Sequence, residues 1–138
     1  MVKAELSRQL MIYVDDSVGT LAEIMSFIST ARINFLAMCA YSIDKKVAVM
    51  FVTNDNNAAK NLLVKHKYDV REEEVILLTM DNKSGSLQTV LNKFSEAQID
   101  LALVYGSGAD SAEVCRIVVI TRNNLDAMMV IKTQLERS

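Results

Sequence analysis

Proline and tryptophan are absent from this 138-residue chain, histidine occurs once, cysteine twice and glycine four times. A tetrahedral zinc site needs several Cys or His ligands at close spacing, and the chain does not offer them. Cys39 and Cys115 both lie inside apolar segments. We interpret them as core thiols rather than as a disulfide or a metal pair. We therefore expect no metal and no cofactor.

The chain also lacks a long uncharged apolar run and a strong excess of either charge. No segment approaches the ~18 apolar residues that mark a membrane-spanning helix. The first ten residues, MVKAELSRQL, lack the continuous apolar stretch of a signal peptide. The net charge of −2 argues against a dedicated nucleic-acid binder, which usually carries a basic face. We expect a cytoplasmic protein with neither a membrane nor a nucleic acid as partner.

What the chain does contain is a repeat. The segment VDDSVGTL at residues 14–21 recurs 66 residues later as MDNKSGSL at residues 80–87. A repeat of this length indicates a duplicated structural module, and two copies suit two similar domains rather than a solenoid. The same offset of 66 matches Asp15 with Asp81, Gly19 with Gly85, Leu21 with Leu87, Ser29 with Ser95, Ala31 with Ala97 and Ile33 with Ile99.

Each copy predicts the same order of elements. An apolar run rich in strand formers, QLMIYVD or VILLTMD, leads through a turn into a helix, then two strands and a second helix. In the second copy Leu125, Met128, Ile131 and Leu135 form the apolar face of that last helix. YDVREEE supplies a final strand to the first copy, although its REEE part also suits a solvated linker. The second copy ends at QLERS, with no room for a final strand.

The order β-α-β-β-α-β is that of the ferredoxin-like split βαβ. We therefore predict an α+β fold made of two such modules, residues 1–72 and residues 73–138, with the final strand of the second missing. Residues 47–52, VAVMFV, are apolar at every position, which indicates a strand covered on both faces. This strand, and an edge left unpaired beside VILLTMD, predict a homodimer or a larger assembly.

The doubled turn and helix carry a family resemblance. VDDSVGTLAEIMSFISTARINF and MDNKSGSLQTVLNKFSEAQIDL resemble the ACT-domain pattern of an apolar strand, Asn or Asp, two residues, Gly, one residue, Leu and a helix. The resemblance covers about Leu10 to Gln134 and identifies the chain as a tandem ACT protein. Val18 and Ser84 stand where the family usually has Pro, and Arg32 and Gln98 stand where it usually has Gly.

The resemblance implies a ligand site. In ligand-binding ACT proteins a small amino acid lies at the interface of two modules, between the turn of one and the start of the second strand of the other. Carried over by position, the ligand-binding residues are Asp16, Gly19, Asn34, Asn82, Gly85 and Asp100. An acid in the first turn repels a ligand carboxylate, so the preferred site is the Asn82–Gly85 turn together with Asn34.

A structural interpretation of the same residues stays open. Asp16, Ser17 and Asn82 are residue types that also cap helix N-termini, and Thr20 with Glu23 has capping-box spacing. Asn34 and Asp100 also suit a helix-to-strand turn. On this interpretation the repeat needs no ligand, and the modules serve assembly alone.

The predicted function is regulatory, not enzymatic. We expect a protein that binds a small amino acid or related metabolite and acts through a change in conformation or assembly, with a protein partner possible. The first alternative is a structural module that dimerises without a ligand. An acylphosphatase-like hydrolase is a weaker one, because DDSVGT brings acids where a phosphate cradle needs Arg. A nucleic-acid-binding sheet is also weaker, because Lys and Arg do not cluster around Tyr41, Phe51 and Tyr105.

Overall fold

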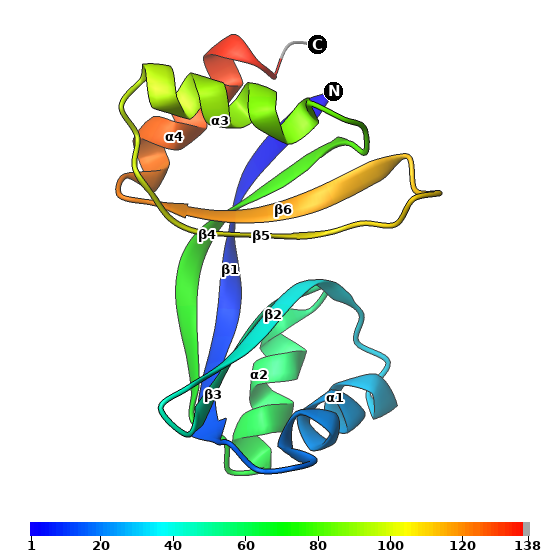
Figure 1. The fold of residues 1–138 in the computed structure, drawn as a ribbon. Helices are drawn as coiled ribbons and strands as arrows, with labels where there is room; N and C mark the ends of the chain where they lie inside the picture. The colour runs from blue at the N-terminus through cyan, green and yellow to red at the C-terminus, as the bar shows by residue number, and fades with distance from the viewer. Residues whose placement is uncertain (137–138) are drawn as a thin grey trace. The chain divides into compact units, whose positions relative to one another are not determined.

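The computed structural model describes residues 1–136, which form an α+β ferredoxin-like fold with a six-stranded antiparallel sheet and four helices. The strand order is β2-β3-β1-β4-β6-β5. None of the helices in this part of the chain has the length and apolar character needed to cross a membrane. The elements are β1 (Val2–Asp15), α1 (Thr20–Thr30), β2 (Phe35–Ile43), β3 (Lys46–Thr53), α2 (Asn56–Lys65), β4 (Val70–Asp81), α3 (Ser86–Glu96), β5 (Leu101–Ser107), β6 (Val114–Thr121) and α4 (Asn124–Gln134) (Figure 1).

The chain divides into two compact units. Arg8–Glu73 form one continuous segment, which we call the inserted unit. Met1–Ser7 and Glu74–Ser138 form the other, which we call the split unit. Both boundaries fall inside long strands, β1 and β4, so each of these strands contributes residues to both units.

The inserted unit has the complete β-α-β-β-α-β order. Its strands follow β2-β3-β1-β4, with β3 antiparallel to both β1 and β2. Helices α1 and α2 lie on one face of these strands (Figure 1). Their inward residues at three- and four-residue spacing meet alternate strand residues in one core, as amphipathic helices on a sheet require. That core contains Leu10, Ile12, Ile24, Ile28, Ile33, Val49, Phe51, Ala59, Leu63 and Val70.

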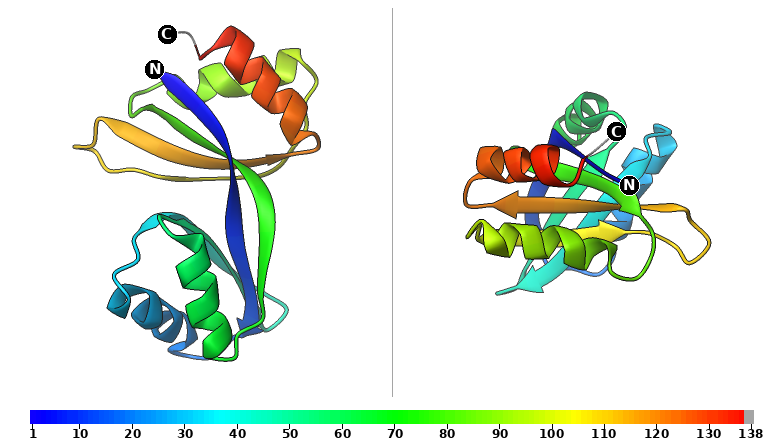
Figure 2. Two further views of the ribbon diagram at one scale, coloured as in Figure 1. Left: turned by 180° about the vertical axis from the view of Figure 1, so that it is seen from behind. Right: turned by 90° about the horizontal axis from the view of Figure 1, so that it is seen from above.

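The split unit has the same layers, with α3 and α4 together on one face of β6 and β5 (Figure 2). Its fourth strand comes from the start of the chain. Ala4 is only 1% exposed and belongs to the same buried cluster as Ile76, Phe94 and Ile131. The Ala4 N–H also donates to Glu136 Oε2 at 3.2 Å.

The edge beside VILLTMD, which we expected to be unpaired, is therefore occupied, and that expectation was wrong. Strand β1 neighbours β4, and Asp81 N–H donates to the Met1 carbonyl at 3.2 Å. The sequence held a signal for this strand, because Val2, Ala4 and Leu6 alternate with polar residues.

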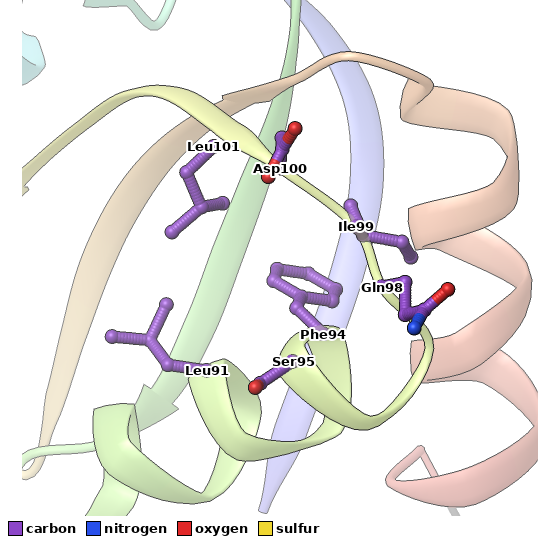
Figure 3. A pocket seen from close by; sticks show the side chains of 7 residues that line it. All are labelled: Leu91, Phe94, Ser95, Gln98, Ile99, Asp100 and Leu101. Carbon is purple, nitrogen blue, oxygen red and sulfur yellow. The ribbon is translucent and has the colours of Figure 1, made fainter.

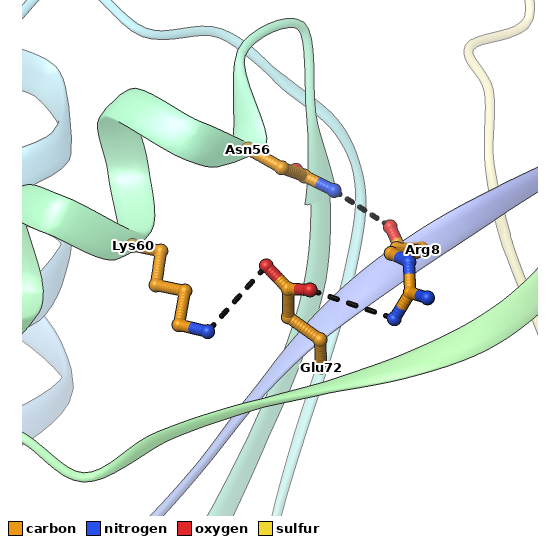
Figure 4. Close-up of polar contacts among 4 residues, drawn as sticks. All are labelled: Arg8, Asn56, Lys60 and Glu72. Atoms are coloured by element: carbon orange, nitrogen blue, oxygen red, sulfur yellow. Dashed lines mark hydrogen bonds and ion pairs between the residues drawn. The ribbon is translucent and has the colours of Figure 1, made fainter.

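Residues 71–74 belong to strand β4 rather than to a solvated linker. Glu72 lies between two cations of the inserted unit, with Oε2 at 3.5 Å from Arg8 Nη1 and Oε1 at 3.7 Å from Lys60 Nζ (Figure 4). Asn56 Nδ2 donates to the Arg8 carbonyl at 2.7 Å. These contacts tie β1, β4 and α2 together where the two strands enter the inserted unit.

The burial of residues in β3 and in α4 can be compared with what the apolar pattern of the sequence predicted. Strand β3 is buried at every residue from Ala48 to Thr53, as its continuous apolar run predicted. In α4, Ile131 is buried and Met128 and Leu135 pack against the core as expected, whereas Leu125 is 67% exposed and Ala127 is buried in addition. In α2 the buried pair is Ala59 and Leu63, spaced in the same way.

We predict that Ala4→Asp destabilises the split unit selectively. An unpaired carboxylate in this core should lower the free energy of unfolding by about 2 kcal/mol or more. Urea unfolding measures the loss, and amide hydrogen exchange locates it, with faster exchange expected in α3 and α4. Leu6→Asp, which introduces the same charge at an exposed residue of the same strand, is the matched control. Equal loss of protection in α1 and α2 would contradict the assignment of residues 1–7 to the split unit.

We predict that Glu136 stabilises the fold and that this stabilisation is lost at acidic pH. A hydrogen bond from Lys132, and a second from the Ala4 N–H, lower the pKa of Glu136 below its ordinary value of 4.5. Because the folded-state pKa is the lower one, the stabilisation is present above 4.5 and disappears as the pH falls through the folded value. Wild type should therefore lose more stability than Glu136→Gln between about pH 5 and pH 3. Glu113→Gln, at an exposed site, should follow wild type; identical pH profiles for wild type and Glu136→Gln would refute the prediction.

Candidate functional site

The two copies of the turn have the same backbone geometry. Gly19 precedes α1 with φ 90°, and Gly85 precedes α3 with φ 87°. This left-handed region is strained for residues with a Cβ, which explains glycine at both positions. A Cβ would meet no atom within 4 Å at either glycine, so the requirement is conformational rather than steric.

The helices that follow these turns have no side-chain cap. Neither α1 nor α3 receives a side-chain hydrogen bond at its N-terminus. By contrast, Asp55 caps α2 through the Ala58 N–H, and Asn123 caps α4 through the Asp126 N–H. The capping interpretation of Asp16, Ser17 and Asn82 is therefore wrong. The first N–H of each helix donates to a backbone carbonyl, Thr20 to Ser17 and Ser86 to Lys83, both at 3.3 Å. The next N–H groups of each first turn receive no side-chain cap, and such a helix N-terminus favours an anion.

Asp16 is held in place beside the start of α1. Its backbone N–H donates to the Lys45 carbonyl at 2.9 Å, and Ser42 Oγ donates to Asp16 Oδ2 at 3.0 Å. The hydroxyls of Ser17 and Thr20 hydrogen-bond to each other at 2.5 Å. The carboxylate is exposed, with Oδ1 directed to no partner among residues 1–136.

These residues surround a cavity of about 330 Å³. Its polar groups come from the turn and from the end of β2, and its apolar wall from α1, β2 and β3. All of them belong to the inserted unit. The lining consists of Asp16, Ser17, Gly19, Thr20, Leu21, Ala22, Ala40, Tyr41, Ser42 and Val47.

The two neighbouring acids at this turn, Asp15 and Asp16, differ in whether a cation pairs with the carboxylate. Asp15 pairs with Lys46 across the β1–β3 ladder, with Oδ1 at 2.5 Å from Nζ. The hydrogen bond from Lys46 lowers the pKa of the Asp15 carboxyl. Asp15 is thus neutralised by a partner, whereas Asp16 carries an unpaired carboxylate into the cavity.

Asn82 has a different role from Asp16, its counterpart in the first copy. Its Nδ2 donates to the Ala109 carbonyl at 2.6 Å and to the Ala112 carbonyl at 3.1 Å. Its backbone N–H donates to the Glu113 carbonyl at 2.9 Å. The amide therefore holds the β5–β6 loop, which is longer than the β2–β3 turn.

The remaining expected residues do not gather at one place within either unit. Gly85 lines a hollow of about 290 Å³ with Lys83 and Thr89, whereas Asn82 lines another of about 350 Å³ along the β5–β6 loop. Asn34 and Asp100 follow the C-terminal ends of α1 and α3, one helix length of about 16 Å from the turns. Among the six, the structure brings Asp16 and Gly19 into a common cavity.

Sequence reasoning missed Ser42, Tyr41 and Val47 as parts of the site. The split βαβ order contained a usable signal, because β2 runs parallel to β1 and the two strands end at the same edge of the sheet. In the residues that the structure describes, no group of three or more His, Cys, Asp or Glu side chains is arranged to hold a metal ion.

No protein-family model and no curated protein matches this sequence. Solved structures match nearly the whole chain. Protein BT0572 from Bacteroides thetaiotaomicron has a TM-score of 0.85 at 21% identity, covering 95% of this chain and 90% of that one. The ligand-free regulatory subunit of aspartate kinase from Thermus thermophilus has a TM-score of 0.64 at 14% identity, covering 99% and 98%. The regulatory subunit of aspartate kinase from Thermus flavus has a TM-score of 0.60 at 11% sequence identity, covering 98% of this chain and 97% of that one.

At these identities the likeness establishes the fold. The chain has the α+β ferredoxin-like fold of ACT domains, which it shares along its full length with regulatory subunits of aspartate kinase.

We predict that Asn82→Asp loosens the β5–β6 loop. The change removes two donated hydrogen bonds and places a carboxylate against two carbonyl oxygens, so stability should fall by about 1–3 kcal/mol. Hydrogen exchange should accelerate at Gly108–Glu113. Asn92→Asp on the exposed face of α3 introduces the same charge and should change stability little. Wild-type exchange in the loop of the Asn82 variant would show that the amide does not hold it.

Proposed function

We propose that this protein is a regulatory, non-enzymatic protein that binds a small amino acid or related metabolite and acts through a ligand-linked change in conformation or assembly. One observation carries the proposal. The uncapped N-terminus of α1 and the carboxylate of Asp16 face the same 330 Å³ cavity. A zwitterion offers the two opposite charges that these groups favour.

The chemistry of the cavity suits the two ends of an amino acid. A ligand carboxylate accepts from the N–H groups at the start of α1, where the helix dipole adds favourable electrostatics. A ligand ammonium donates to Asp16 Oδ1, while Ser42 holds Oδ2. Leu21, Ala40 and Val47 provide apolar surface for a short side chain. The volume lies at the lower end of the range for small-ligand pockets.

The inserted unit is a better location than the Asn82–Gly85 turn. Asn82 Nδ2 already donates to two carbonyl groups, so its amide N–H groups are committed. Asp16, by contrast, keeps one carboxylate oxygen open to a ligand. We expected the acid in the first turn to repel a ligand carboxylate. In this proposal Asp16 instead accepts a hydrogen bond from the ligand ammonium group. Asn34, Asn82, Gly85 and Asp100 are not part of this cavity.

We also propose that the chain is a tandem pair of ACT modules. One module is Arg8–Glu73, and the other is Met1–Ser7 with Glu74–Ser138. Local details repeat between the units in support of a duplication. Thr53 and Asn56 in one, and Thr121 and Asn124 in the other, make the same pair of hydrogen bonds ahead of the second helix.

A regulatory role accords with the solved structures of similar fold, two of which are regulatory subunits. The proposed partners are a second copy of the chain and a protein that receives the signal. Strands β2 and β5 stand at the ends of the strand order, and an edge strand is a common place for two copies to pair.

We predict that one or more of the twenty amino acids raises the melting temperature of the protein, because a ligand that binds only the folded state stabilises it by mass action. Calorimetry with that amino acid should then show Asp16→Asn binding about ten- to a hundredfold more weakly, the effect of losing one charge-assisted hydrogen bond. Light scattering with and without the ligand tests for a change in assembly.

Asp69→Asn, the same charge change on the exposed segment after α2, should keep wild-type affinity. If an amino acid binds and Asp16→Asn keeps that affinity as well, the site is misplaced. If no amino acid binds at millimolar concentration, the ligand-free structural alternative replaces this proposal.

A further inference from the structure

A hollow of about 560 Å³ lies in the split unit beside the C-terminal end of α3 (Figure 3). Its wall is largely apolar, with Leu91 of the helix and Leu101 of the strand on facing sides. Three of the last carbonyl groups of α3 accept hydrogen bonds from the N–H groups of residues 97–99. Asp100 is the one charged residue of the lining, and the family resemblance already implies it as a ligand position. Polar groups of the split unit that no ligand position covers lie on its sheet instead.

A row of three polar side chains crosses this sheet on the face away from α3 and α4. In the register of β4, β6 and β5, Arg116 lies opposite Thr79 on one side and opposite Ser107 on the other. The neighbours of Arg116 along β6, Cys115 and Ile117, pack in the core beneath the helices, so the arginine side chain points to the other face. Directly opposite residues have Cβ atoms about 4.5–5.5 Å apart. Arg116 therefore has a hydroxyl side chain close by on each side.

The corresponding row of the inserted unit has no charge. There Ala48 lies between Tyr13 and Tyr41 in the register of β1, β3 and β2. At the repeat offset of 66, the two tyrosines correspond to Thr79 and Ser107. Because the inserted unit forms the same β-α-β-β-α-β order with a small apolar residue at the centre of this row, the fold by itself does not require an arginine there.

The charge of Arg116 is not balanced inside the protein. The side chains of Thr79, Arg116 and Ser107 make no hydrogen bond or ion pair with any of residues 1–136. Asp81, the acid two residues along β4 from Thr79, has other cations, with Oδ2 at 2.7 Å from the Met1 ammonium group and at 3.9 Å from Lys83 Nζ. A guanidinium group and two hydroxyl groups thus remain free for a ligand.

These three groups suit an oxyanion. The planar guanidinium fork donates two parallel hydrogen bonds to a phosphate or a carboxylate, and a hydroxyl group on either side can donate to a further oxygen. A tetrahedral phosphate has oxygen atoms outside the plane of the fork, whereas a carboxylate has only two. In the adjacent row Leu77 is 4%, Val118 0% and Tyr105 9% exposed. Such a buried neighbourhood on one side strengthens a charge-assisted hydrogen bond.

We propose that the row of Thr79, Arg116 and Ser107 binds a phosphate group, either as inorganic phosphate or as part of a phosphate monoester. Arg116 donates two hydrogen bonds from its fork, and the hydroxyl groups of Thr79 and Ser107 each donate one to the remaining oxygen atoms. This site lies in the split unit, apart from the Asp16 cavity of the inserted unit. It stands or falls independently of the function proposed above.

The test is an NMR titration of the full chain with sodium phosphate and with ethyl phosphate, each compared with sodium chloride at equal ionic strength. Both phosphates at millimolar concentration should shift the Arg116 Nε–H signal and the amide signals of Thr79 and Ser107. Tighter binding of ethyl phosphate would identify a monoester as the ligand class, and tighter binding of inorganic phosphate would identify the free ion. Equal shifts with chloride, or no shift with either phosphate, would overturn the proposal.

Variants separate the charge, the fork and the hydroxyl groups. Arg116→Gln should weaken phosphate binding about ten- to a hundredfold, and Thr79→Val about two- to tenfold. Arg116→Lys keeps the charge but removes the fork, so it should still weaken binding about tenfold. Arg122→Gln, the same change at an exposed arginine beyond the end of β6, should leave binding unchanged. Circular dichroism checks folding, and wild-type affinity in Arg116→Gln, or an equal loss in Arg122→Gln, would refute the proposal.

Discussion

The structure of the split unit depends on one contact between distant parts of the chain, the packing of Ala4 under α3 and α4. Glu74–Ser138 provide three strands and two helices, which leaves the fourth strand position open. Residues 1–7 take that position, bury Ala4 and donate its N–H to Glu136. The small side chain of Ala4 lets the strand approach the helices closely, and Glu136 satisfies a backbone donor that the core cannot. The inserted unit, Arg8–Glu73, has all four strands within its own segment.

The two copies of the turn show how one backbone geometry acquires two roles. Gly19 and Gly85 have nearly the same φ, and neither following helix is capped by a side chain. The residue three positions before each glycine then decides the local chemistry. Asp16 keeps one carboxylate oxygen without a partner beside a cavity, while the amide of Asn82 donates hydrogen bonds to two carbonyl groups of a longer loop. A hydrogen-bond donor already used inside the protein is not available to a ligand.

The two units also differ at the C-terminal ends of α1 and α3. Phe35 fills the space beside β2 by packing on Phe51, whereas Leu101 and Val119 leave a hollow beside β5. Asn34 and Asp100 then differ in charge at equivalent positions. The two units thus have the same kinds of helix, strand and bulge, but one has a neutral, filled corner and the other a charged, open corner. Changes at two core positions are enough for this, because protein interiors have little spare volume.

By itself the sequence determined the element order, the strand-to-helix turns and most of the helix faces. The 66-residue repeat, the glycines and the periodic apolar residues report local conformation, and Ile131 in the last helix is buried as its spacing predicted. It did not determine which residues meet across the fold. The pairing of residues 1–7 with β4, the bond from Ser42 to Asp16 and the engagement of Asn82 by Ala109 join positions 26 to 80 residues apart. Those contacts depend on strand order and loop path, which side-chain periodicity does not encode, so only the tertiary structure decided them.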